Sequence, residues 1–109
     1  MPSNNFNEGK PRPSLLLQDA PNAVREILKV FEEGAQKYGR GNWKESIGVE
    51  GEEDKFYRDN LDSLQRHVFG AYQGEAFDPD GGNLHLAKIA VRAIYAIEYL
   101  LGGANSKTC

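Results

Sequence analysis

The segment from Leu84 to Leu101 constrains the fold more than any other part of the chain, because nearly all of its residues are apolar. Asn83 can cap a helix at its start, and Gly102-Gly103 can end it. A helix with so few polar positions is expected to be buried on most sides. Arg92 and Glu98 interrupt the apolar run, which is also too short to cross a bilayer. The segment therefore predicts a core helix and no contact with a membrane.

Two further stretches show the spacing of amphipathic helices. Apolar residues recur every three or four positions from Val24 to Tyr38 and again from Tyr57 to Tyr72. Asp19 or Asn22 can cap the first of these helices, with Pro21 in its first turn. We expect an all-α fold, a small bundle of about three main helices near residues 22–38, 55–74 and 83–101.

The remaining segments predict the domain organisation. Residues 39–54 contain four glycines and no sustained period, which predicts a long loop, and residues 77–82 have the composition of a turn. We expect a flexible arm over residues 1–18, one helical domain over 19–102 and a loose tail over 103–109. Two helices and an arm cannot cover every side of the apolar third helix, so we also expect a homo-oligomer.

Charge and cysteine content narrow the classes of partner and compartment. The 109 residues include 13 basic and 16 acidic side chains, a net charge of −3. This balance provides no long-range attraction to a nucleic-acid polymer or an anionic membrane, so a bound anion needs a local basic cluster. Cys109 is the single cysteine, which fits a reducing compartment, and the N-terminal residues do not resemble a signal peptide. We expect a cytoplasmic protein.

A stripe of basic side chains is the least expected feature of the apolar third helix. His85, Lys88 and Arg92 lie at positions i, i+3 and i+7 and share one face. They can line a wall that binds phosphate. Equally, they can face solvent or pair with carboxylates such as Glu32 or Asp62.

Pairs of carboxylates at helical spacing suggest a site for a hard divalent cation. The pairs are Glu32-Glu33, Asp59-x-x-Asp62 and Glu75-x-x-Asp78, and their oxygen atoms suit Mg²⁺ or Mn²⁺. Each pair can also be an ordinary solvated face, and Asp62 can form an ion pair with Arg66. The two histidines of the chain are too few for a zinc site built from histidine alone.

The single tryptophan has two interpretations as well. Trp43 lies in a glycine-rich segment beside Lys37, Arg40 and Asn42. It can anchor the core, or its ring can cover a purine base.

Several of these segments, taken in order, resemble a known family. They are Gly9 with Leu15-Leu-Leu17, the run from Val30 to Trp43 with Lys-Tyr-Gly-Arg-x-Asn-Trp, Asp62-x-x-x-Arg66-His67, Gly74-Glu75-x-x-Asp78, and His85-Leu-Ala87. Together they resemble the N-terminal domain of phage dATP/dGTP diphosphohydrolases and, more distantly, the all-α NTP pyrophosphohydrolases. The resemblance implies a phage protein that handles purine deoxynucleotides. Lys37 stands where the wider group has a third glutamate, so the carboxylate set of that group is incomplete here.

The leading hypothesis is a metal-dependent phosphohydrolase that acts on dATP or dGTP. Asp62 is the candidate general base, and Glu32, Glu75 and Asp78 are the candidate ligands of Mg²⁺ or Mn²⁺. The candidate nucleotide-binding residues are Lys10, Lys37, Trp43, Arg66, His67, His85, Lys88 and Arg92. A second hypothesis is a non-catalytic phage sponge that sequesters the nucleotide second messengers of host anti-phage immunity, and a third is a structural domain.

Overall fold

The computed structural model describes residues 8–47 and 53–103, and this part of the chain is all-α. Its helices are α1 (Ser14–Leu17), α2 (Pro21–Tyr38), α3 (Trp43–Ile47), α4 (Glu53–Tyr72) and α5 (His85–Glu98), which continues into a π-helical turn, η1 (Tyr99–Gly103). Three of them are long, as predicted. Within the described residues, β-structure is limited to one isolated antiparallel bridge between Phe77 and Leu84.

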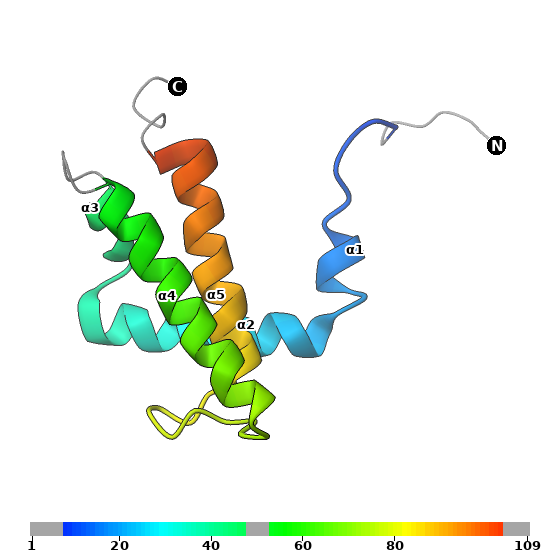
Figure 1. Cartoon of the computed structure of the whole chain (residues 1–109). Helices are drawn as coiled ribbons and strands as arrows, with labels where there is room; N and C mark the ends of the chain where they lie inside the picture. The colour runs from blue at the N-terminus through cyan, green and yellow to red at the C-terminus, as the bar shows by residue number, and fades with distance from the viewer. Residues whose placement is uncertain (1–7, 48–52, 104–109) are drawn as a thin grey trace.

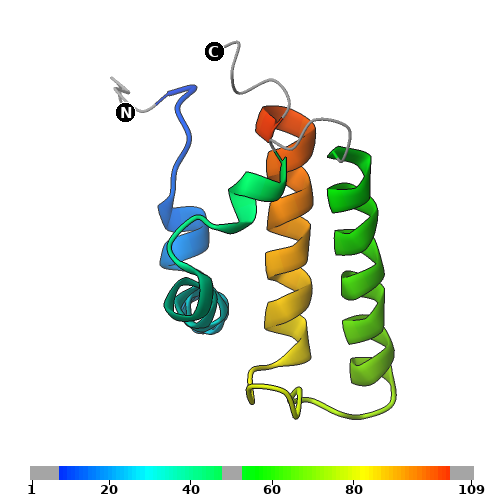
Figure 2. The same cartoon turned by 90° about the vertical axis from the view of Figure 1, so that its left-hand side faces the viewer.

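The helices α4 and α5 form an antiparallel pair, and α2 crosses beside it. The pair is seen side by side in both views, joined by the loop at its lower end (Figures 1 and 2). Figure 2 shows α2 nearly end-on while α4 and α5 run vertically, so α2 lies across the pair rather than parallel to it. Side chains from three helices therefore meet where α2 passes α5.

Two predicted helix caps are absent, and one predicted loop contains a helix. The cap residue of α2 is Ala20 and that of α5 is Leu84, and neither makes a side-chain capping bond. The Asn83 amide instead donates to Glu33 Oε1 on α2, at 3.3 Å. The predicted loop over 39–54 begins correctly, because Gly39 adopts a φ of 96° that ends α2, but α3 then forms within it.

Contacts between aromatic side chains join α5 and η1 to the other helices. Trp43 of α3 stacks on Tyr95 of α5 with ring centroids 4.3 Å apart, and Phe31 of α2 meets the same ring edge-on at 5.9 Å. Tyr57 of α4 stacks on Tyr99 at 5.5 Å. Such contacts fix α2 and α3 against α5, and α4 against η1.

One side of α5 is not covered by the other described residues. The buried apolar residues of the described part are small or medium: Ala87, Val91 and Ala96. Leu86 of α5 is 67% exposed and Leu101 of η1 is 78% exposed, so the predicted burial of this segment is incomplete on that side. No helix of the described residues is long and apolar enough to cross a membrane.

Candidate functional site

A pair of histidines joins the beginning of α5 to the last turns of α4. His85 is only 5% exposed, and its Nδ1 lies 3.0 Å from Nδ1 of His67. Its other nitrogen, Nε2, lies 2.7 Å from Glu75 Oε1 in the loop after α4. Gly70 makes room for this ring, because a Cβ at position 70 would lie 2.7 Å from His85 Nε2. A glycine on α4 thus allows the imidazole to lie against that helix.

The hydrogen-bond pattern fixes the roles of the ring nitrogens. A carboxylate only accepts, so Nε2–H of His85 donates to Glu75, and Nδ1 of a neutral His85 is then an acceptor for Nδ1–H of His67. Burial lowers the pKa of His67 below 6.5, an effect that the Asp78 carboxylate partly opposes. Burial therefore favours the neutral form of the His67 ring.

Asp78 completes the cluster from the loop between α4 and α5. Its Oδ2 accepts a hydrogen bond from Lys88 Nζ at 2.8 Å and lies 3.8 Å from His67 Nδ1. The Lys88 hydrogen bond, helped by the backbone N–H of Asp80, lowers the pKa of Asp78 below 3.8, although partial burial raises it. Lys88 also donates to the Asp80 carbonyl oxygen at 2.8 Å. The Lys88 ammonium thus binds the α4–α5 loop at both Asp78 and Asp80.

One ligand atom from each of His67, Asp78 and His85 lies within 4.8 Å of the other two, so these residues could hold a metal ion. Two imidazole nitrogens and a carboxylate oxygen are a donor set that many metalloproteins use. Glu75 occupies the outer nitrogen of His85, which is the usual place for a carboxylate that orients a ligating histidine. The residues present therefore fit a metal.

Next to this cluster is a pocket of about 870 Å³, formed by α2, the α2–α3 loop, α4 and α5. This volume is in the range of small-molecule binding sites. Its basic lining residues are Lys37, Arg40, Lys44, Arg66, Lys88 and Arg92. Its acidic lining residues are Glu32, Glu33, Asp78 and Asp80. The pocket wall is thus more basic than acidic, whereas the whole chain is acidic.

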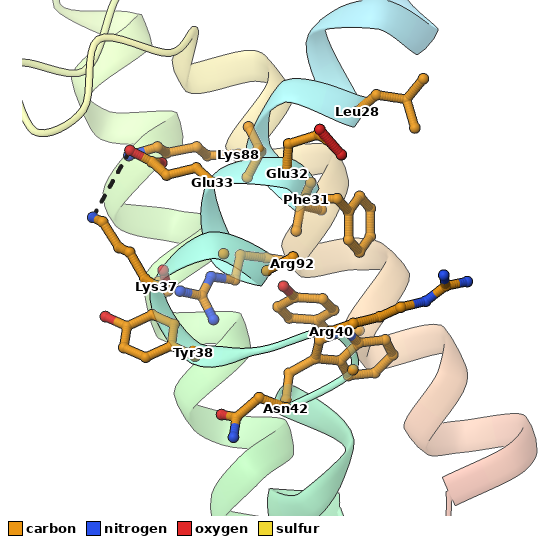
Figure 3. A pocket seen from close by; sticks show the side chains of 18 of the residues that line it. Leu28, Phe31, Glu32, Glu33, Lys37, Tyr38, Arg40, Asn42, Lys88 and Arg92 are labelled. Carbon is orange, nitrogen blue, oxygen red and sulfur yellow. Dashed lines mark ion pairs between the residues drawn. The ribbon is translucent and has the colours of Figure 1, made fainter.

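None of the three arginines that line this pocket, Arg40, Arg66 and Arg92, has a carboxylate partner in the described part of the chain. Arg92 donates to Asn60 Oδ1 at 3.1 Å and lies over the Tyr95 ring, and the structure gives Arg66 no ion pair. Figure 3 shows the Arg92 guanidinium in the middle of the pocket, near the α2 side chains. The dashed line there marks the ion pair of Lys37 with Glu33, which is long at 3.8 Å. Guanidinium groups left without carboxylates are suited to bind a phosphate.

The family described as dATP/dGTP diphosphohydrolase, N-terminal, matches residues 2–108, which is almost the whole chain. The chain belongs to this family. No match was found among curated proteins or among solved structures.

The structure brings most of the predicted site residues of this family member together. Those that line the pocket are Glu32, Lys37, Trp43, Arg66, His67, Asp78, Lys88 and Arg92. His85 and Glu75 adjoin it through His67. Lys10 and Asp62 are exposed and do not line it, and the expected ion pair of Asp62 with Arg66 does not form among the described residues.

The candidate metal site differs from the expected one. Of the expected ligands, only Asp78 is in the converging group, while Glu75 binds the outer nitrogen of His85 and Glu32 is exposed on α2. His67 and His85 were predicted to bind nucleotide and not metal, because two histidines are too few for a site built from histidine alone. The possibility that was missed is that Asp78 joins the two histidines as the third ligand of one metal ion.

Proposed function

We propose that the chain binds a purine deoxynucleoside triphosphate in the pocket and hydrolyses it with the help of a divalent metal ion. The observation that carries this proposal is the juxtaposition of arginines without carboxylate partners and a group of metal-ligating residues along one pocket. The description of the family supports dATP and dGTP as substrates.

The phosphates would lie between α4 and α5, where Arg66 and Arg92 enter the pocket from opposite helices. A guanidinium binds two phosphate oxygens at once, which suits a polyphosphate chain. Lys37 would contribute a third cation, because its weak ion pair with Glu33 leaves its ammonium available to a stronger partner. This arrangement would place the polyphosphate next to His67 and Asp78.

The base would lie at the α3 end of the pocket. Trp43 lines the pocket while it stacks on Tyr95, so a purine ring would extend an existing aromatic stack. Asn42 also lines this end and is exposed, so its amide could bond to a base edge. The interpretations of Trp43 as a core residue and as a base platform are therefore compatible.

The divalent metal ion of the reaction would be held by His67, Asp78 and His85. When bound, the ion would polarise a phosphate oxygen and lower the pKa of a bound water. We do not retain Asp62 as a general base, because its exposed side chain does not line the pocket.

A second function, capture of a nucleotide second messenger without hydrolysis, is favoured by one observation. Lys88 already places an ammonium on Asp78, so this carboxylate is neutralised without a metal. A pocket with surplus basic charge would then bind phosphates but not activate water.

Incubation of the protein with dATP, dGTP and cyclic nucleotides, with and without Mn²⁺, distinguishes the two functions. Repeated turnover of dATP or dGTP that depends on the metal supports the hydrolase. Depletion that stops at one nucleotide per site, and is reversed when the protein is heated, supports capture. If dATP and dGTP are neither bound nor hydrolysed, the proposal is wrong.

A further inference from the structure

The donor atoms around His67 and His85 indicate which kind of metal the site selects. The two Nδ1 atoms lie 3.0 Å apart, and Asp78 Oδ2 lies 3.8 Å from Nδ1 of His67. Two tetrahedral nitrogen ligands of a zinc ion are separated by roughly 3.3 Å, given a bond of about 2.0–2.1 Å. The two imidazoles therefore need to move apart by only a few tenths of an ångström to admit an ion in place of the shared proton.

The surroundings of His85 hold its ring in the orientation of a ligand. Glu75 Oε1 accepts a hydrogen bond from His85 Nε2, with the two atoms 2.7 Å apart. This bond keeps the ring proton on Nε2 and leaves Nδ1 free to bind a metal. The ring is buried, and the missing side chain at Gly70 leaves the space that it occupies. A histidine constrained at both nitrogens and by its packing is preorganised, so little rotamer freedom remains to be lost when an ion binds.

We infer that His67, His85 and Asp78 form a site for an imidazole-preferring divalent transition metal of the Zn²⁺ or Co²⁺ type, with Glu75 as a positioning residue. Mg²⁺ takes oxygen ligands and retains its waters, so a site with two nitrogen donors disfavours it. Three protein ligands leave a fourth position for water or substrate. His67 and Asp78 both line the pocket, so this position lies beside the proposed phosphate site.

Lys88 competes with a metal ion for the Asp78 carboxylate. Its ammonium binds Asp78 Oδ2 at 2.8 Å, and a metal must share this oxygen with it or use the other one. Removal of the ammonium in Lys88→Met should therefore tighten metal binding severalfold. A merely structural role of Lys88 would predict weaker binding instead.

This inference refines the metal of the proposed function, but its test needs no nucleotide. The full chain without an affinity tag is prepared with Cys109→Ser, so that its single thiol cannot bind metal, and stripped with a chelator. Calorimetric titration with Zn²⁺ should show one site per chain, and Co²⁺ should give the visible absorption of a tetrahedral ion. Excess Mg²⁺ should not displace either ion.

Variants identify the ligands. Asp78→Asn and His67→Gln should abolish Zn²⁺ binding, while Asp59→Asn, a change to an exposed acid on α4, should not affect it. Glu75→Gln should weaken binding by about 10–100-fold, the usual effect of losing an orienting carboxylate. The Glu75 side chain is about half exposed, so this variant should fold even if the histidine variant does not.

Zn²⁺ binding with unchanged affinity in both Asp78→Asn and Glu75→Gln, or Mg²⁺ binding as tight as that of Zn²⁺, would overturn the inference. Absence of Zn²⁺ binding by the folded wild-type chain would overturn it as well. Neither result bears on nucleotide binding, which is measured separately through Arg66.

Discussion

Replacement of Gly70 by alanine tests the histidine arrangement without removal of any functional group. Gly70 lies within α4, where a glycine normally weakens a helix. A Cβ at this position would lie 2.7 Å from Nε2 of His85 and 3.0 Å from Cε1, closer than atoms in contact can approach. The His85 ring cannot easily retreat, because Glu75 and His67 bind its two nitrogens.

The magnitude follows from two opposing effects. Alanine in place of glycine within a helix stabilises by about 1 kcal/mol. Insertion of a methyl group into a filled space costs about 1–3 kcal/mol. We therefore expect Gly70→Ala to leave the free energy of unfolding unchanged or to lower it by up to about 2 kcal/mol. Gly34→Ala is the matched control in α2, because nothing lies within 4 Å of its Cβ, and it should stabilise by about 0.5–1 kcal/mol.

Urea denaturation of both variants, followed by circular dichroism, measures this difference directly. Zn²⁺ titration then shows whether the displaced ring still binds metal, and we expect a loss of affinity for Gly70→Ala only. The reasoning would be refuted if Gly70→Ala were stabilised as much as Gly34→Ala and bound Zn²⁺ with unchanged affinity.

Three further predictions concern charge, assembly and the base site. The hydrogen bond from Lys88 lowers the pKa of Asp78, so it stabilises the fold above about pH 3.8 and this stability is lost as the pH falls through the lowered pKa. Lys88→Met should therefore be less stable than the wild type at neutral pH, and this difference should shrink in urea denaturation at acidic pH. We propose that the exposed apolar side of α5 joins copies of the chain, so Leu86→Glu should convert an oligomer to monomers in light scattering, and a monomeric wild type would contradict this. The fluorescence of Trp43, the single tryptophan, should change when dATP is added, and an unchanged spectrum at saturation would exclude contact with the base.

The helices could be predicted from the sequence because their signals are local. Apolar residues at helical spacing identified α2, α4 and α5, and the glycines at 39 and 41 identified the end of α2. The cap at Asn83 was wrong for a reason that is not local. The side chain of Asn83 bonds to Glu33, 50 residues away, and this contact exists only once α2 has crossed the α4–α5 loop.

The metal-ligating group depends in the same way on tertiary structure. His67 and His85 are 18 residues apart and meet only when α4 and α5 pair as antiparallel neighbours in one register. Spacing along the chain paired Glu75 with Asp78 as metal ligands, but it could not show that Glu75 would bind a histidine and that only Asp78 would join the cluster. Pairing of residues within a helix was also a poor guide to Arg66, which forms no ion pair with Asp62 among the described residues.

Nucleotide binding by the pocket is the central claim, and two arginines of α4 test it most directly. Arg66 lines the pocket, whereas Arg58 lies on the same helix outside it and pairs with Asp54. In calorimetric titration with dATP, Arg66→Gln should lose about 1–3 kcal/mol of binding free energy, the value of a charge-assisted hydrogen bond, while Arg58→Gln should bind like the wild type. Equal affinity of both folded variants for dATP, or no binding by the wild type, would contradict the account.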